Sequence, residues 1–338
     1  MVVVALLWSI AGVVTRQLES AARFEVTFWR SAFTALSLLI ILPLWRRAGT
    51  ALAAAPVDER SALGRFLHRH WGLQPESGAF WISGICWSVM FTAFMLALTF
   101  TRVANVLIIM ALGPLFTALL ARLLIGQPLP LRTWTAVVLA GAGIIYMYGS
   151  QFLQAFSDPQ SGVSDLIVGS LIALCVPLAG AVNWTVVQRS QTQGERIDLV
   201  PSVLLGALIS SLLTLPLAFP FIATASDIAW LAGLGLFQLA IPCTLSVVCA
   251  RVLKAPEVSL LALLEVIFGI LLAWIGAGES PGPEVVAGGS LVIGALVANE
   301  LLGWRSRRSV PRIQTLQATP DGSDPASIPP GESHAHHR

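Results

Sequence analysis

The sequence is short of charge. Only 11% of its 338 residues are Asp, Glu, Lys or Arg, and 56% are apolar, whereas soluble globular domains carry about 25% charged residues. A soluble chain of this length needs more charge than that to cover its surface, so the composition argues strongly against a soluble enzyme. The charges stand in short clusters between long apolar stretches, which is typical of a helical protein that crosses the lipid bilayer many times.

Lysine is almost absent, because Lys254 is the only lysine among 20 basic residues. A nucleic-acid-binding protein gathers its basic residues on one polar face. Here the arginines flank apolar segments, so we expect no nucleic-acid partner. The cysteines all lie inside apolar segments without CxxC spacing, and we interpret them as small buried apolar side chains: Cys86, Cys175, Cys243 and Cys249.

Several catalytic patterns are also missing. No P-loop motif is present, so ATP does not drive this protein directly. All five histidines lie between residues 46 and 78 or beyond Trp304, and no Asp lies in the middle of an apolar segment. The residues of an intramembrane protease are therefore lacking, and we expect no enzymatic activity, no cofactor and no metal. His334, His336 and His337 could hold a metal, although a solvated tail also explains them.

Ten apolar segments are long enough, or nearly so, to cross a bilayer as helices, which takes about 20 residues. Tryptophans mark many of their edges, as expected of rings that prefer the headgroup level. The first segment is the shortest; a cleaved signal peptide is the alternative, but no basic stretch precedes it and no A-x-A site follows. The predicted spans are Val2–Val14, Val26–Trp45, Phe80–Leu98, Val106–Leu124, Trp134–Tyr148, Leu166–Val187, Leu199–Phe219, Ile228–Val248, Val258–Ala277 and Val285–Leu302.

The basic residues predict the orientation. With the N-terminus in the cytoplasm, sixteen basic residues fall inside and three outside (Arg16, Arg23 and Arg102), with Arg30 within a span. This bias follows the positive-inside rule. It places both termini and the loop Arg46–Gly78 in the cytoplasm and the loop Gln151–Gly162 outside. The tail 304–338 is rich in Pro, Ser, Asp and Gly, a composition that predicts disorder.

The chain repeats itself. A shift of 173 residues lays the first two spans on the sixth and seventh and matches Arg16 with Arg189 and Glu25 with Asp198; a shift of 152 lays the fourth span on the ninth. Each repeat unit has five spans, an odd number, so the two units must cross the membrane in opposite senses. Inverted repeats with a central site are the construction of many secondary transporters. We expect a first repeat over residues 1–150 and a second over residues 151–303.

The second repeat resembles a known family. The run from Ser259 to Trp274, followed by Gly278-Glu279 and Gly288-Gly289, is similar to the second repeat of an EamA-type carrier of the drug/metabolite transporter superfamily. Trp8 and Phe28-Trp29-Arg30 are similar to the first repeat. The resemblance covers roughly residues 2–303 and implies an all-α membrane protein with ten helices in two inverted EamA repeats, located in a bacterial inner membrane. The sequence departs from the family pattern at Gln127 and Val266.

Glu265 is the outstanding candidate for function, because a charge inside the bilayer is costly unless it is paired or hydrated. It is the eighth residue of its span, about 11 Å deep at 1.5 Å per residue. Its repeat mate is Gly113, next to Pro114. Such a carboxyl suits reversible protonation; the alternative is a structural Glu that binds a neighbouring backbone or an arginine.

Arg30 is the second candidate. It is the fifth residue of its span, about 6 Å from the outer edge at 1.5 Å per residue. It could hold a substrate carboxylate through two parallel hydrogen bonds, or it could snorkel to the membrane surface.

Four further side chains could line a small-molecule site, which usually combines aromatic walls with a few hydrogen-bonding groups. Each could equally pack between helices. They are Trp8, Asn183, Trp184 and Gln238.

Together these observations predict a secondary transporter that exports a small metabolite by alternating access, with protons as the candidate coupling ion. The alternative is a membrane-embedded interaction protein that uses the loop Arg46–Gly78 as its contact surface. The repeat favours transport, because a scaffold has no need of inverted halves. The expected partners are the lipid bilayer and a small-molecule substrate, and a homodimer is one candidate assembly.

Overall fold

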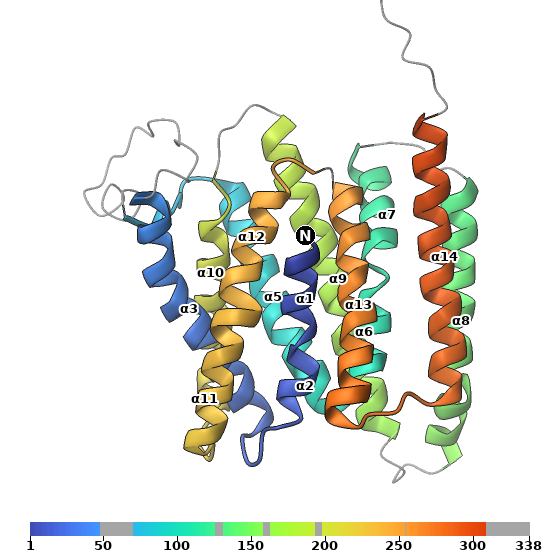
Figure 1. Cartoon of the computed structure of the whole chain (residues 1–338), viewed down its shortest axis with the longest axis horizontal. Coiled ribbons are helices and arrows are strands. Elements are labelled where there is room, and N and C mark those ends of the chain that lie inside the picture. The colour runs from blue at the N-terminus through green and yellow to red at the C-terminus, as the bar shows by residue number, and fades with distance from the viewer. Residues whose placement is uncertain (48–69, 126–130, 158–162, 193–197, 254, 309–338) are drawn as a thin grey trace, which may run out of the picture.

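The computed structural model describes residues 1–47, 70–125, 131–157, 163–192, 198–253 and 255–308. Within these ranges the chain is all-helical, without strands. Consecutive helices join into ten rods that lie side by side (Figure 1). The rods are α1 (Val2–Ser9) with α2 (Ala11–Thr15), α3 (Arg23–Arg47), α5 (Gly78–Phe100), α6 (Val103–Met110) with α7 (Gly113–Ile125), α8 (Leu131–Ser157), α9 (Val163–Thr192), α10 (Pro201–Thr214) with the 3-10 turn η1 (Leu215–Leu217), α11 (Ala225–Gly233) with the π-helix η2 (Leu234–Ala240) and α12 (Ile241–Cys249), α13 (Ala255–Ala277), and α14 (Pro283–Arg308).

Six helices of the described residues are long and apolar enough to cross a membrane, and four more apolar helices are shorter. The six are Arg23–Arg46, Gly78–Phe100, Val103–Leu120, Asp165–Ser190, Ala225–Cys249 and Pro283–Gly303. The four are Val2–Thr15, Leu131–Met147, Pro201–Leu217 and Leu261–Ala277. Together they correspond to the ten apolar segments that the sequence predicts.

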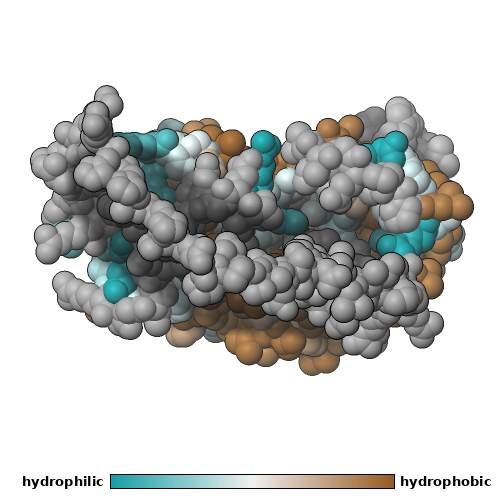
Figure 2. Space-filling model, turned by 90° about the horizontal axis from the view of Figure 1, so that it is seen from above, coloured by the Kyte–Doolittle hydropathy of each residue, from teal (hydrophilic) through white to brown (hydrophobic). Residues whose placement is uncertain are grey.

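The outer surface of the bundle is apolar. Leu36, Leu212, Val138 and Ile275 lie on four different rods, and each side chain is more than half exposed. Figure 2, which looks down on the upper end of Figure 1, shows apolar residues around the flank and hydrophilic residues on the end. Exposed apolar residues on so many rods are unusual for a soluble monomer and fit contact with lipid.

Each rod has a preferred neighbour. The most extensive packing joins α5 to α9, α8 to α14, α10 to both α5 and α3, and α1 to α13. Two buried clusters fill the space between the rods, one around Leu98 and Leu107 and the other around Leu38 and Leu204. Helices far apart in the sequence therefore form one bundle, with residues from both halves in each cluster.

Glycine allows the closest of these contacts. α8 and α14 approach at Gly143 and Gly288, where a Cβ atom added to Gly288 would lie 2.6 Å from the carbonyl oxygen of Gly143 and would also clash with Met147. Gly294, six residues later on α14, is exposed and has open space around the same position. The two glycines thus differ in packing while sharing one helix.

We expect Gly288→Ala to destabilise the protein by about 1–3 kcal/mol, because overpacking forces helices or side chains to shift. Gly294→Ala should be neutral or stabilise by up to about 1 kcal/mol, since alanine favours the helix over glycine. Unfolding in mixed detergent micelles measures both. Equal unfolding midpoints for the two variants would contradict the close α8–α14 contact.

The structure corrects three details of the sequence prediction. The fifth helix does not end near Tyr148 but continues to Ser157, so only residues 158–162, which lie outside the described ranges, remain for the loop that follows. Cys175 is exposed rather than buried, and Cys249 is partly exposed. Most of the loop Arg46–Gly78, the tail beyond Arg308 and its histidines also lie outside the described residues.

Candidate functional site

A cavity of about 140 Å³ lies in the middle of the bundle. Its walls come from α1, α3, α5, the α6–α7 junction, α9, the α11–α12 rod and α13, so both halves of the chain contribute. An apolar cavity of about 150 Å³ can hold a benzene molecule. The space therefore suits a compact ligand of about the size of a single ring.

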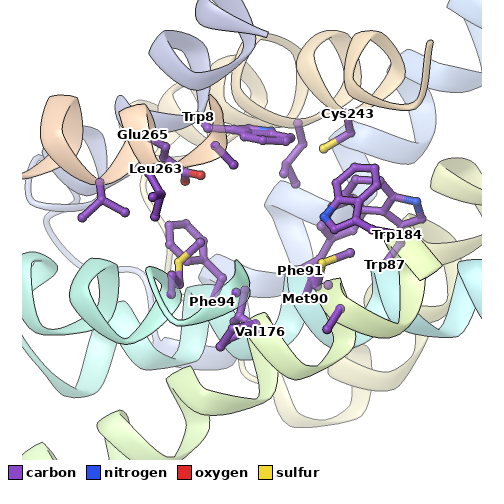
Figure 3. A pocket seen from close by; sticks show the side chains of 18 of the residues that line it. Trp8, Trp87, Met90, Phe91, Phe94, Val176, Trp184, Cys243, Leu263 and Glu265 are labelled. Atoms are coloured by element: carbon purple, nitrogen blue, oxygen red, sulfur yellow. The ribbon is translucent and has the colours of Figure 1, made fainter. Parts of the chain in front are cut away.

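Most of the wall is aromatic or apolar. Trp87 lies 5.5 Å from Phe91 and 6.0 Å from Trp184 between ring centroids, and the two indoles meet edge to face at 86°. Figure 3 shows Trp87 and Trp184 together at one side of the cavity, with Glu265 and Trp8 at the other. The indole N–H of Trp87 is buried without a hydrogen-bond acceptor, so this wall keeps one unused donor.

Arg30 is fully buried, with 0% of its surface exposed. Its Nη1 donates to Oε1 of Gln238 (3.1 Å) and its Nη2 to the carbonyl oxygen of Phe91 (2.6 Å), while its Nε has no acceptor. The guanidinium carbon lies 5.8 Å from the ring centroid of Phe94. The snorkelling alternative is therefore wrong, because the side chain turns into the bundle. Its acceptors are neutral, so its charge has no carboxylate partner among the described residues.

Glu265 lies in the opposite wall, and only 7% of its surface is exposed. Its carboxylate points into the open space of the cavity (Figure 3). No described side chain forms an ion pair with it. Cys243 also lines the cavity.

Five of the six predicted site residues line this cavity: Trp8, Arg30, Trp184, Gln238 and Glu265. Asn183 does not. Its Oδ1 accepts a hydrogen bond from Ser83 (2.7 Å), whose hydroxyl is also 2.7 Å from that of Ser202. Asn183 thus joins α9 to α5, and through Ser83 to α10, outside the cavity.

Two irregular helices shape the site. Pro114 has no N–H to donate, so the fourth rod breaks between α6 and α7, and Met110, Gly113 and Pro114 all face the cavity. A broken helix exposes backbone groups that a regular helix would satisfy internally. In the eighth rod, the π-helix η2 presents Gln238 to Arg30, and the hydroxyl of Thr34 donates to the carbonyl of Gly235 at 3.2 Å.

The cavity wall includes positions that the sequence shifts relate to one another. Under the shifts found in the sequence, four lining residues of the first half correspond to four lining residues of the second. A bulky or acidic side chain corresponds to a small one in three of the four pairs. The pairs are Trp8 with Ala181, Met110 with Ala262, Gly113 with Glu265, and Pro114 with Val266.

Sequence reasoning missed the α5 wall, which contributes Trp87, Phe91 and Phe94. These positions, spaced by four and three residues, share one face of a helix. That spacing is a signal, but the opposite face of the same segment is also apolar, so the pattern does not show which face lines a cavity.

The sequence matches a known protein family. A family model described as the EamA-like transporter family matches residues 1–149 and 167–299. The chain belongs to the EamA-like transporter family. It is therefore a multi-pass membrane transporter of the drug/metabolite transporter superfamily, and this family consists of transporters rather than enzymes.

The fold of this EamA-like transporter is shared with a solved crystal structure. That protein is 18% identical in sequence, and the match covers 89% of this chain and 96% of the other with a TM-score of 0.59. At this level of identity the likeness concerns the fold alone. Among curated proteins, none matches this EamA-like chain in sequence.

Proposed function

We propose that this chain is a ten-span secondary transporter that moves a small organic anion through the central cavity by alternating access. Its two five-helix repeats lie in opposite senses across the membrane and exchange roles as the cavity opens to one side and then the other. Export is the expected direction, down the metabolite's own concentration gradient. The observation that carries the proposal is the buried Arg30, whose charge and Nε lack an anionic partner in a cavity lined by both repeats.

An anionic substrate supplies the negatively charged partner that Arg30 lacks. A buried charge without a partner is costly, and a carboxylate can accept from two donors of one guanidinium. The unused N–H of Trp87 offers one more donor. The aromatic wall then accommodates the apolar part of the molecule, and the volume of about 140 Å³ limits its size. The substrate class that fits best is a compact monocarboxylate.

Glu265 is proposed to carry the proton. With Glu265 protonated, the cavity bears the single positive charge of Arg30 and attracts an anion; with Glu265 ionised, that attraction weakens. Proton and anion therefore bind together more favourably than either does alone. This electrostatic coupling favours movement of the two in the same direction.

Transport itself is tested with purified protein in proteoliposomes. Metabolite profiles of cells with and without the protein first identify carboxylates that change in concentration. Counterflow of the labelled candidate into vesicles loaded with the same compound should then exceed that of protein-free vesicles. Absence of counterflow for every carboxylate that responds in cells would refute the proposed function.

The proposed orientation has its own test. We expect a reporter fused beyond Arg308 to report the cytoplasm and one inserted within residues 158–162 to report the outside, because sixteen of the basic residues lie on the cytoplasmic side in this orientation. Activity of paired cytoplasmic and external reporters measures both sites. Detection of the C-terminal reporter outside would overturn both the ten-span count and the inverted repeat.

A further inference from the structure

One end of the bundle is tied together by an ion pair between the two halves. We use "lower end" for the end of the bundle, as drawn in Figure 1, where α2 ends and α3 begins. There Nη2 of Arg16, after α2, lies 2.6 Å from Oε1 of Glu279, after α13. The side chains of Arg16 and Glu279 are 31% and 19% exposed, so the pair is accessible to water yet partly enclosed.

Both partners also hold the turn between α5 and α6. Nη2 of Arg16 donates to the carbonyl oxygen of Thr101 (3.0 Å), and Oε2 of Glu279 accepts from the backbone N–H of Val103 (3.0 Å). Val103 is the first residue of α6, and Arg102 before it provides no side-chain cap. Glu279 therefore supplies from the other half of the chain the anionic cap that a helix N-terminus favours.

The backbone directs Glu279 to this position. Gly278 follows the last residue of α13 with a φ of +66°, a conformation that glycine adopts without strain. The next N–H, that of Glu279, donates to the carbonyl of Ala273 at 3.1 Å. The turn ends the helix and points the carboxylate across the bundle.

The three rods tied here also contribute to the cavity above. α1 carries Trp8, α6 ends at Met110 and α13 carries Glu265. Between this ion pair and the cavity lies apolar packing that includes Val103, Leu107 and Ala11. The cavity cannot open to the lower end unless these elements separate there.

We propose that Arg16 and Glu279 form a lock on the lower gate, which must break in each transport cycle; this rests on the proposed alternating access. A partly exposed ion pair is weak, on the order of 1 kcal/mol, so it changes the population of the open form about fivefold without blocking opening. A lock of this strength slows leakage through the gate while still allowing turnover.

The equivalent positions of the other repeat do not carry the same pair of charges. The repeat equivalents of Arg16 and Glu279 are Arg189 and Gln127. Gln127 lies outside the described residues, so the comparison concerns residue identity alone. A neutral amide cannot form the corresponding ion pair with Arg189, so this particular pair of charges is not repeated at the equivalent positions.

The test measures access to Cys243, which lines the cavity, in a background with Cys86, Cys175 and Cys249 replaced by Ala. A small membrane-impermeant thiol reagent is applied to the face that carries Glu279, in intact cells or inverted vesicles as the topology requires. We expect Glu279→Gln to raise the labelling rate about fivefold. The matched control Glu284→Gln, an exposed glutamate on α14, should leave the rate unchanged.

Charge reversal separates a lock from a structural contact. Arg16→Glu alone should speed labelling, and Arg16→Glu combined with Glu279→Arg should return it toward the original rate. An unchanged rate in Glu279→Gln, with an unchanged unfolding midpoint, would overturn the proposal. If labelling responds but no counterflow is found, the lock stands and the proposed function fails.

Discussion

Arg30→Lys should lower kcat/KM for the transported carboxylate by about two orders of magnitude, equivalent to about 2.7 kcal/mol. The planar guanidinium binds Gln238 and the Phe91 carbonyl while its Nε has no acceptor. An ammonium group is a compact point charge and cannot keep two parallel hydrogen bonds to a carboxylate in addition to these contacts. The initial rate of counterflow in proteoliposomes, normalised to reconstituted protein, gives the comparison.

Arg23→Lys is the matched control for this experiment. Arg23 is seven residues earlier on the same helix, and its ion pair with Asp165 (3.1 Å) is half exposed. The Arg23→Lys variant should therefore lose little transport activity. The unfolding midpoint of each variant shows whether the protein has folded. Normal transport by well-folded Arg30→Lys would mean that bidentate binding is not the role of Arg30.

Glu265→Gln should abolish accumulation driven by a proton gradient while keeping downhill exchange. Glutamine preserves the shape of the side chain but cannot ionise, so the cavity holds a constant positive charge at every pH. In the unchanged protein, an inward proton gradient should drive the anion inward, because both bind together. In the variant, the rate of exchange should no longer depend on pH between about 5 and 8.

Uptake with and without a proton gradient, and exchange across a pH series, distinguish these outcomes. Glu284→Gln serves as the control again, because it removes an exposed carboxylate from a neighbouring helix. Full uphill transport together with an unchanged pH profile in Glu265→Gln would leave this residue without a coupling role.

Apolar periodicity predicts the helices of this protein well, because a span in lipid is apolar all round. The same uniformity hides which face turns inward. Asn183 and Trp184 are adjacent in the sequence, yet a helix places them about 100° apart, so only Trp184 reaches the cavity. Counting residues from a predicted helix start also misjudged Arg30. The helix begins at Arg23, and the direction of the side chain, rather than its depth, decides whether it snorkels.

Charged residues near the helix ends also make contacts that the sequence pattern does not predict. Glu25 is fully buried and accepts hydrogen bonds from the backbone N–H groups of Ile222 and Ala223, at 3.0 Å each. Asp227 is likewise buried and accepts from the backbone N–H of Glu19 at 2.9 Å. The Thr224-x-x-Asp227 capping box is visible in the sequence. Asp227 also binds the backbone of Glu19 in the other half of the chain, and no local sequence pattern predicts this tertiary contact.

Because of the π-helix in the eighth rod, the number of residues in this rod decides which of its side chains reach the cavity. Removing one residue within Leu234–Ala240 would allow a regular α-helix and would rotate everything on one side of the deletion by about 100° relative to the other. Deleting Leu239 or Ala240, which lie between Gln238 and Cys243, would turn one of these two side chains away from the cavity, whereas Asp227 would keep its capping box. A substitution scan alters side chains one at a time and leaves this register untouched. A single-residue deletion scan along the rod would therefore reveal a dependence on spacing, with specificity changing sharply for deletions between Gln238 and Cys243.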